Sequence, residues 1–248
     1  MTATPAPRIG FDRKVEIDWL DVVASRLAAG DSPDEVRAAL DIALTRSLSS
    51  AETRGAKEKT TTVVTRVWMT VHPDVQPLRD AALRAFESAT ATDRIALHWA
   101  MCCATYPFFG DVVSGCGKLM ALTGSCSQAQ LRRRMAELWG DRSTVSWAMQ
   151  RVMRSMLQWG AVRVGKKRGE YEPLARRIPV LGAVADVLVE ALAAALRRPI
   201  AVPQVASEPA LFPFAVQVYV GRLRANPRLD VHRGGDRVDY IEWRRGRT

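Results

Sequence analysis

The sequence has little of the chemistry that metal sites and acid–base catalysis use. Its 248 residues contain three histidines, His72, His98 and His232, which are far apart in sequence, and His98 lies in an apolar stretch that predicts a core position. The motifs G-x-S-x-G, H-E-x-x-H and G-x-G-x-x-G are absent. Residues 115–118 (GCGK) lack the first glycine and the hydroxyl residue of a phosphate-binding loop, and indicate a flexible break in a helix. We therefore predict no enzymatic activity, no cofactor, no metal and no small-molecule substrate.

Cysteine is also scarce. The four thiols, Cys102, Cys103, Cys116 and Cys126, form no C-x-x-C pair, and no histidine stands at ligand spacing from any of them. The first residues, MTATPAPR, lack the apolar segment of a secretion signal. We expect a cytoplasmic protein with buried, reduced thiols.

Long apolar runs without charge are missing too. The most apolar stretch, residues 178–196, carries Asp186 and Glu190 near its middle. Two carboxylates are costly inside a bilayer, so this stretch predicts a core helix and no membrane association.

Positive charge is abundant and unevenly placed. The formal net charge is +10. Residues 128–177 hold 12 Lys and Arg against 4 Asp and Glu, a net of +8, whereas residues 1–127 hold 14 against 15, a net of −1. A basic protein implies an anionic partner, and concentration of the charge in one segment favours nucleic acid.

Hydrophobic periodicity predicts a mainly α fold. A disordered lead at 1–10 precedes an α-helical bundle at 11–123, in which a capping box at 32–35 opens the second helix. Residues 93–105 are nearly all apolar and predict the central helix, which the aromatic stretch 106–111 interrupts. The helices expected here span 16–29, 33–48, 51–71, 75–88, 93–105 and 111–122.

Residues 124–177 predict a winged helix-turn-helix. A capping box at 127–130 opens a helix to Trp139 that buries Leu131, Met135 and Leu138. A polar turn at 140–142 leads to Ser143 as N-cap of a second helix at 144–159. Two strands, 161–164 and 170–173, then flank a basic tip. Helix, turn, helix and hairpin is the order of a module that usually binds nucleic acid.

The second helix divides into two faces at 100° per residue. One is apolar and packs inward through Val145, Ala148, Met149, Val152, Met156 and Trp159. Groups that reach phosphates and base edges come from three places: the opposite face of this helix, which ends at Gln158; the start of the helix; and the wing tip. The predicted nucleic-acid-binding residues are Arg142, Ser143, Thr144, Trp147, Gln150, Arg151, Arg154, Lys166, Lys167 and Arg168.

Other interpretations remain open for parts of this surface. Arg132, Arg133 and Arg134 on the first helix are equally explained as a solvated face. Trp147 could instead contact another part of this chain or a protein partner. No arrangement of side chains specifies a base sequence, so we expect phosphate-dominated binding with weak sequence preference.

Residues 178–248 predict a small α+β unit. A helix is expected at 181–198, and two alternating segments, 228–232 and 237–243, flank Gly234-Gly235 as a β-hairpin. Helix followed by hairpin repeats the order of the preceding unit, so a second winged-helix-like element is the alternative interpretation.

Several segments of residues 16–165 together resemble a known family. They are EIDWLDVVASRLAAG and PDEVRAALDIALTRSLSS near the start, the corner FFGDVV at 108–113, SQAQL at 127–131, DRSTV at 141–145 and LQWGAV at 157–162. This order resembles the BrxA component of BREX bacteriophage-defence systems. The resemblance implies a cytoplasmic, non-enzymatic, DNA-binding accessory protein that works beside the other BREX proteins. It assigns no DNA-contacting side chain, and the chain after Pro173 is longer than in compact members.

The sequence thus predicts an accessory protein of a BREX-like system that binds duplex DNA. The first alternative is an RNA-binding or transcription-regulating protein, because helical bundles with basic faces also bind RNA. A scaffold whose winged helix docks another protein is the second. An enzyme without a recognisable motif is the last.

Overall fold

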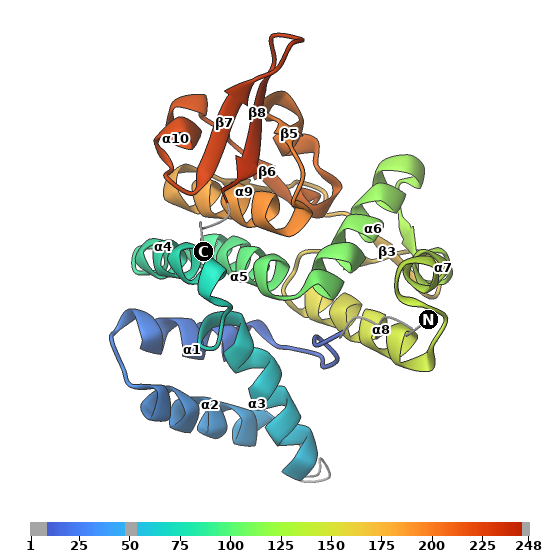
Figure 1. Cartoon of the computed structure of the whole chain (residues 1–248). Helices are drawn as coiled ribbons and strands as arrows, with labels where there is room; N and C mark the ends of the chain where they lie inside the picture. The colour runs from blue at the N-terminus through green and yellow to red at the C-terminus, as the bar shows by residue number, and fades with distance from the viewer. Residues whose placement is uncertain (1–8, 48–53, 245–248) are drawn as a thin grey trace, which may run out of the picture.

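The computed structural model describes residues 9–47 and 54–244, and the chain in these ranges is mainly helical with small β-sheets. Helix α5 (Ala91–Thr105) lies in the middle of the molecule (Figure 1). The helices of residues 17–68 lie on one side of it, the helix and sheet of residues 182–243 lie on the other, and the two helices of residues 128–158 lie at one end. The predicted mainly α class is confirmed.

The N-terminal helices match the predicted ones closely. The capping box at Ser32 is present, because Ser32 N donates to Glu35 Oε2 at 2.8 Å and Glu35 N donates to Ser32 Oγ at 3.4 Å. Residues 1–8 of the predicted lead, and 48–53 between two helices, lie outside the described residues. The helices are α1 (Ile17–Ala28), α2 (Pro33–Ser47), α3 (Arg54–Trp68) and α4 (Gln76–Phe86), the last preceded by the 3-10 turn η1 (Pro73–Val75).

Helix α5 is the buried centre that its apolar sequence predicts. A capping box between Thr90 and Asp93, which sequence reasoning missed, fixes its start. Its side chains from Ala96 to Cys103 are all buried. Trp99 packs edge-on against Phe109, Phe212 and Phe214 and donates its Nε1–H to Ala210 O at 3.0 Å. This one side chain therefore joins the N-terminal helices to the C-terminal unit.

Helix α6 (Pro107–Thr123) corrects two predictions. The aromatic stretch 106–111 does not form a loop between two helices. The helical path breaks only at Tyr106, and Pro107 is already in the first turn of α6. The glycines at 115–118 are not a flexible break. A Cβ on Gly117 would lie 2.8 Å from the carbonyl carbon of Pro209 and closer still to its oxygen, so Gly117 allows η3 (Pro209–Leu211) to pack against the helix.

The basic segment follows as β1 (Cys126–Ser127), α7 (Gln128–Trp139), α8 (Ser143–Gln158), β2 (Arg163–Val164) and β3 (Glu170–Glu172). The three strands form one antiparallel sheet in the order β1-β3-β2. The capping box expected at Ser127 is wrong. Ser127 makes no side-chain cap bond; it pairs with Glu170 in the sheet, and Gln128 N donates to Gly169 O at 2.8 Å.

The buried face of α7 differs from the predicted one at a single position. Leu131 and Met135 are buried as expected, but Leu138 is 64% exposed. Trp139 is buried in its place, against Phe108, with its Nε1–H donating to Asp111 Oδ2 at 2.8 Å. The larger ring thus takes the core position, and its polar edge is satisfied by a carboxylate of α6.

The C-terminal unit contains a parallel pair and a second antiparallel sheet. Strand β4 (Ile178–Val180) pairs with β6 (Phe214–Val216), and α9 (Gly182–Leu196) packs on α5. The predicted hairpin is confirmed as β7 (Leu229–Arg233) and β8 (Asp239–Trp243). The remaining elements are β5 (Ile200–Ala201), the 3-10 turns η2 (Val202–Ser207) and η3, and α10 (Val220–Ala225).

The two three-stranded sheets share one strand order, although in the C-terminal unit β6, which pairs with β4 in a separate sheet, comes before the hairpin. In each, a long helix is followed by a two-residue strand, a second helical segment begins at once, and a hairpin comes last. The sheet orders, β1-β3-β2 and β5-β8-β7, are equivalent. The short strand pairs with the last strand of the hairpin in both, through Cys126↔Tyr171 and Ile200↔Ile241.

Candidate nucleic-acid interface

Helix α8 is fixed by the apolar face that its sequence predicts. Val145, Met149, Val152 and Met156 are all buried, as are Ala148 and Trp159 on the same side. The helix packs against α7 and α6 through these side chains. The opposite face therefore points away from the core, and its orientation is set by packing.

The predicted contact residues of α8 lie on or beside this outer face. Ser143, Thr144, Trp147 and Arg154 are exposed, and Gln150 and Arg151 are half-buried. The Trp147 ring is 64% exposed, which is unusual for so large an apolar side chain. The structure thus brings hydroxyl, aromatic, amide and guanidinium groups together along one helix.

The start of α8 differs from the prediction. Arg142 is the N-cap residue, whereas Ser143 is already the first residue of the helix. No side-chain hydrogen bond caps this end, and Arg142 Nη2 donates to Trp139 O at 3.0 Å. Part of the Arg142 guanidinium therefore satisfies the end of α7 and helps to fix the turn between the two helices.

An N-terminal segment, residues 9–16, covers one flank of α8, and the helical pattern gave no sign of it. Val15 N donates to Ser155 Oγ at 2.8 Å, and Trp159 Nε1 donates to Val15 O at 2.9 Å. Ile17 N, at the start of α1, donates to Gln158 Oε1 at 2.9 Å. Gln158 was expected on the nucleic-acid face, but its amide oxygen is occupied by this contact.

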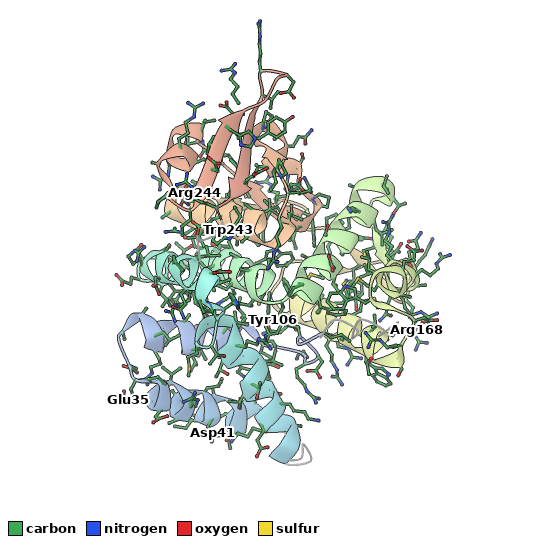
Figure 2. The ribbon with its side chains drawn as sticks, viewed as in Figure 1. Glu35, Asp41, Tyr106, Arg168, Trp243 and Arg244 are labelled. Atoms are coloured by element: carbon green, nitrogen blue, oxygen red, sulfur yellow. The ribbon has the colours of Figure 1, made fainter. Side chains whose placement is uncertain are left out.

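The tip of the β2–β3 hairpin carries the predicted cations. Lys166, Lys167 and Arg168 are exposed, and Arg168 lies at the outer edge of the molecule (Figure 2). The bond from Gln128 N to Gly169 O holds this tip beside the start of α7. The wing cations are therefore held close to the helices by backbone pairing.

Arg154 connects the outer face of α8 with the hairpin. Burial raises the pKa of the Tyr171 hydroxyl on β3, and the nearby charge of Arg154 opposes that rise. Arg154 on α8 therefore lies near strand β3 of the hairpin.

Most positive charges of this surface have no carboxylate partner among the residues that the structure describes. Of the twelve lysines and arginines in residues 128–177, only Arg163 lies within 4.0 Å of a carboxylate oxygen in the described part of the chain, that of Glu172 at 2.9 Å. In contrast, five of the eight arginines between residues 178 and 244 are paired, namely Arg198, Arg222, Arg224, Arg228 and Arg244. The positive potential is thus concentrated around α7, α8 and the β2–β3 loop.

Two further observations concern other kinds of site. Among residues 9–47 and 54–244, no group of three or more His, Cys, Asp and Glu side chains is arranged to hold a metal ion. None of the helices in the same ranges is both long and apolar enough to cross a membrane.

Comparisons with known proteins identify no relative. No family model matches the chain, and neither a curated protein nor a solved structure is significantly similar to it.

Proposed function

We propose that this protein binds duplex DNA through α8 and the β2–β3 loop. The observation that carries the proposal is the group of unpaired cations on this surface. A surface that serves only solubility mixes charges of both signs. Among the described residues, eleven of the twelve cations in residues 128–177 lack a carboxylate partner. Arg142 and Arg177 donate to backbone oxygens, and the other nine are available to neutralise phosphates.

The connectivity of the segment supports the same proposal. The order α6–β1–α7–α8–β2–β3, with sheet order β1-β3-β2, is the order of a winged helix-turn-helix. In that module the second helix of the pair enters the major groove and the hairpin contacts the adjacent backbone. By this assignment α8 is the recognition helix and residues 165–169 are the wing tip.

Eight of the ten predicted residues have a direct role in this binding mode. Arg151 and Arg154 donate to phosphate oxygens, Gln150 reaches a base edge, and the hydroxyls of Ser143 and Thr144 meet a phosphate at the positive end of the helix. The three cations of the wing tip bind the backbone beside the main contact. Phosphate contacts dominate, so sequence preference is weak.

We further propose that the protein is a non-enzymatic accessory of a BREX-like defence system. This role rests on the sequence resemblance alone. A tagged chain expressed with its genomic neighbours should co-purify with a methyltransferase or a large ATPase. If the purified protein carries no neighbouring gene product, the assignment to such a system is wrong, and the DNA-binding proposal is unaffected.

Fluorescence anisotropy with a labelled duplex tests the DNA-binding proposal. With about five to eight phosphate contacts, log Kd against log salt should have a slope of roughly 4 to 7. Alanine at Arg151, Arg154, Lys166, Lys167 and Arg168 should lower that slope by about 4 and weaken binding strongly at 0.1 M salt. A control variant with Ala at Arg46, Lys59 and Arg84 should bind as the wild type does. These are three exposed cations of α2, α3 and α4 with no carboxylate partner among the described residues.

Three outcomes contradict the proposal. The first is failure to bind duplex DNA at any salt concentration. The second is a preference for RNA of the same length at matched salt, which would favour the RNA-binding alternative. If the five-residue variant binds duplex DNA normally and instead loses a co-purifying protein, the segment is a protein-docking scaffold.

A further inference from the structure

A cavity of about 300 Å³ lies between the N-terminal segment and α8. The segment contributes Asp12 and Arg13 to its walls, and α8 contributes Trp147 and Arg151. The volume is at the lower end of the range for small-molecule sites, which suits one planar ring with its substituents.

The packing of the N-terminal segment forms this cavity in advance. Phe11 is fully buried and packs against the rings of Tyr106 and Phe109. Gly10 has φ of +71° and lies under the Tyr106 ring, and Phe11 N donates to Ile9 O at 2.8 Å across this tight turn. The wall opposite α8 is therefore held by the core, and a ligand need not order it.

The cavity combines a stacking surface with free donors. Trp147 presents 64% of its surface to solvent. In the described part of the chain Arg151 has no carboxylate partner, and the nearest carboxylate oxygen to Arg13 Nε, that of Asp12, is 3.8 Å away. Arg13 Nε is buried and makes no hydrogen bond. A buried donor without an acceptor is costly, so this site favours a ligand that supplies one.

We propose that this cavity holds one unpaired nucleotide of the strand that α8 grips, with its base stacked on Trp147 and its phosphate bound by Arg13 and Arg151. The proposal rests on the proposed function, because the strand reaches the cavity along the same helix. Asp12 accepts a hydrogen bond from an exocyclic amine of the base, which favours cytosine, adenine or guanine over thymine.

The chemistry of the walls selects an unpaired nucleotide over the other occupants. A base within a continuous duplex is stacked on both faces, so it has no free face on which the Trp147 ring could stack. An apolar protein side chain would stack on the ring but would supply no acceptor to the Arg13 Nε–H or to the Arg151 guanidinium. Aromatic platforms flanked by arginines are the usual means of holding single-stranded bases.

The test compares a fully paired duplex with the same duplex carrying one unpaired cytosine. We expect about ten-fold tighter binding of the bulged duplex, within the range that one stacked base supplies. Trp147→Ala should abolish this preference and Trp147→Phe should keep most of it. Leu138→Ala is the matched control, since Leu138 is equally exposed on the neighbouring helix and lies outside the cavity. A 2-aminopurine at the unpaired position should lose fluorescence on binding to the wild type but not to Trp147→Ala.

The outcomes separate this inference from the proposed function. If no duplex binds, the proposed function fails and this inference falls with it. If both duplexes bind equally, or if Trp147→Ala weakens both by the same factor, DNA binding stands and the nucleotide site is wrong. If free deoxycytidine monophosphate binds as tightly as the bulged duplex, the cavity serves a free nucleotide and the inference is overturned.

Discussion

At the scale of single residues, hydrogen bonding explains why a histidine lies in the core. His98 is fully buried, and its Nδ1 accepts from Trp68 Nε1 at 3.0 Å. Because the indole N–H can only donate, Nδ1 carries no proton, and Nε2 must donate to Asp21 Oδ1 at 2.9 Å. The sequence predicted a hydrogen-bonded core histidine, and the structure confirms it. The partners lie 30 and 77 residues away, where local sequence gives no sign of them.

This arrangement predicts a pH dependence of stability. Burial lowers the pKa of His98 below its ordinary 6.5, against the opposing effect of Asp21. The unfolded chain therefore binds a proton that the folded protein excludes, and the free energy of unfolding falls as pH drops from 6.5 toward the lower folded pKa. His98 contributes at most about 1.4 kcal/mol per pH unit to the dependence of the free energy of unfolding on pH.

Urea denaturation of His98→Gln between pH 7.5 and 5 measures this contribution. The variant should be less stable at pH 7.5 by about 1–3 kcal/mol, since the Trp68 indole loses its acceptor. Its stability should also fall less steeply with acidification than that of the wild type. Replacement of the exposed His72 by Gln is the control. Equal slopes for the wild type and His98→Gln would show that His98 does not exclude a proton in the folded state.

Two glycines of α6 should respond to alanine with opposite signs. Gly117→Ala places a methyl group against the Pro209 carbonyl, and overpacking of this kind costs about 1–3 kcal/mol or more. At Gly110 an added Cβ meets nothing within 4 Å, so Gly110→Ala should stabilise the same helix by about 0.5 kcal/mol. Thermal unfolding of both variants measures the difference. A stabilised Gly117→Ala would mean that η3 does not pack closely on α6.

At the scale of elements, local periodicity correctly predicted the features that depend on a single helix, such as which of its side chains face inward. Every side chain predicted on the inward face of α8 is buried, because a 3.6-residue repeat determines which side chains share a face, whereas the burial of Met153 and Ser155 was not predicted. The same reasoning wrongly placed Leu138 rather than Trp139 on the core side of α7. Periodicity does not reveal that Asp111 on another helix accepts a hydrogen bond from the indole N–H of Trp139. It also missed residues 9–16 on the flank of α8, where Val15 bonds to Ser155 across 140 residues.

The two sheets of like strand order should differ in function because their charges differ. Beside the second hairpin, Arg222 and Arg224 of α10 are paired with Asp186 and Asp239. Its tip carries Asp236, whose pKa is lowered by a hydrogen bond from the Tyr240 hydroxyl. In the C-terminal unit, carboxylates thus neutralise most of the arginines. The corresponding cations of residues 128–177 are mostly without a carboxylate partner in the described structure.

A pair of double variants tests this contrast with equal loss of charge. Lys166→Ala with Lys167→Ala should lower the salt slope of duplex binding by about 1.8. Arg233→Ala with Arg237→Ala, at the second hairpin, should leave it within about 0.5 of the wild type. Equal effects would mean that net charge, or a second contact through β7–β8, governs binding.

At the scale of the whole molecule, a single core runs through all the segments that the sequence separates. One cluster of buried side chains extends from Phe11 to Ile241. The sequence predicted domain boundaries at residues 123 and 177, because the charge composition and the expected element types change there. They do not reveal that Trp99 of the bundle binds Ala210, because a contact across 111 residues leaves no local pattern.

This shared core predicts that the N-terminal part cannot fold alone. In a chain ending at residue 177, α5 loses α9, whose buried Val184, Leu188 and Leu192 each contribute about 1.5–3 kcal/mol. Their sum is comparable with the whole stability of a typical domain, about 5–15 kcal/mol. Truncation at 177 should therefore abolish cooperative thermal unfolding, whereas a chain ending at 244 should unfold in one transition like the full protein. A cooperative transition in the 177-residue chain would show that the bundle and the basic segment are stable without α9. The C-terminal unit would then not be needed for the rest of the chain to fold.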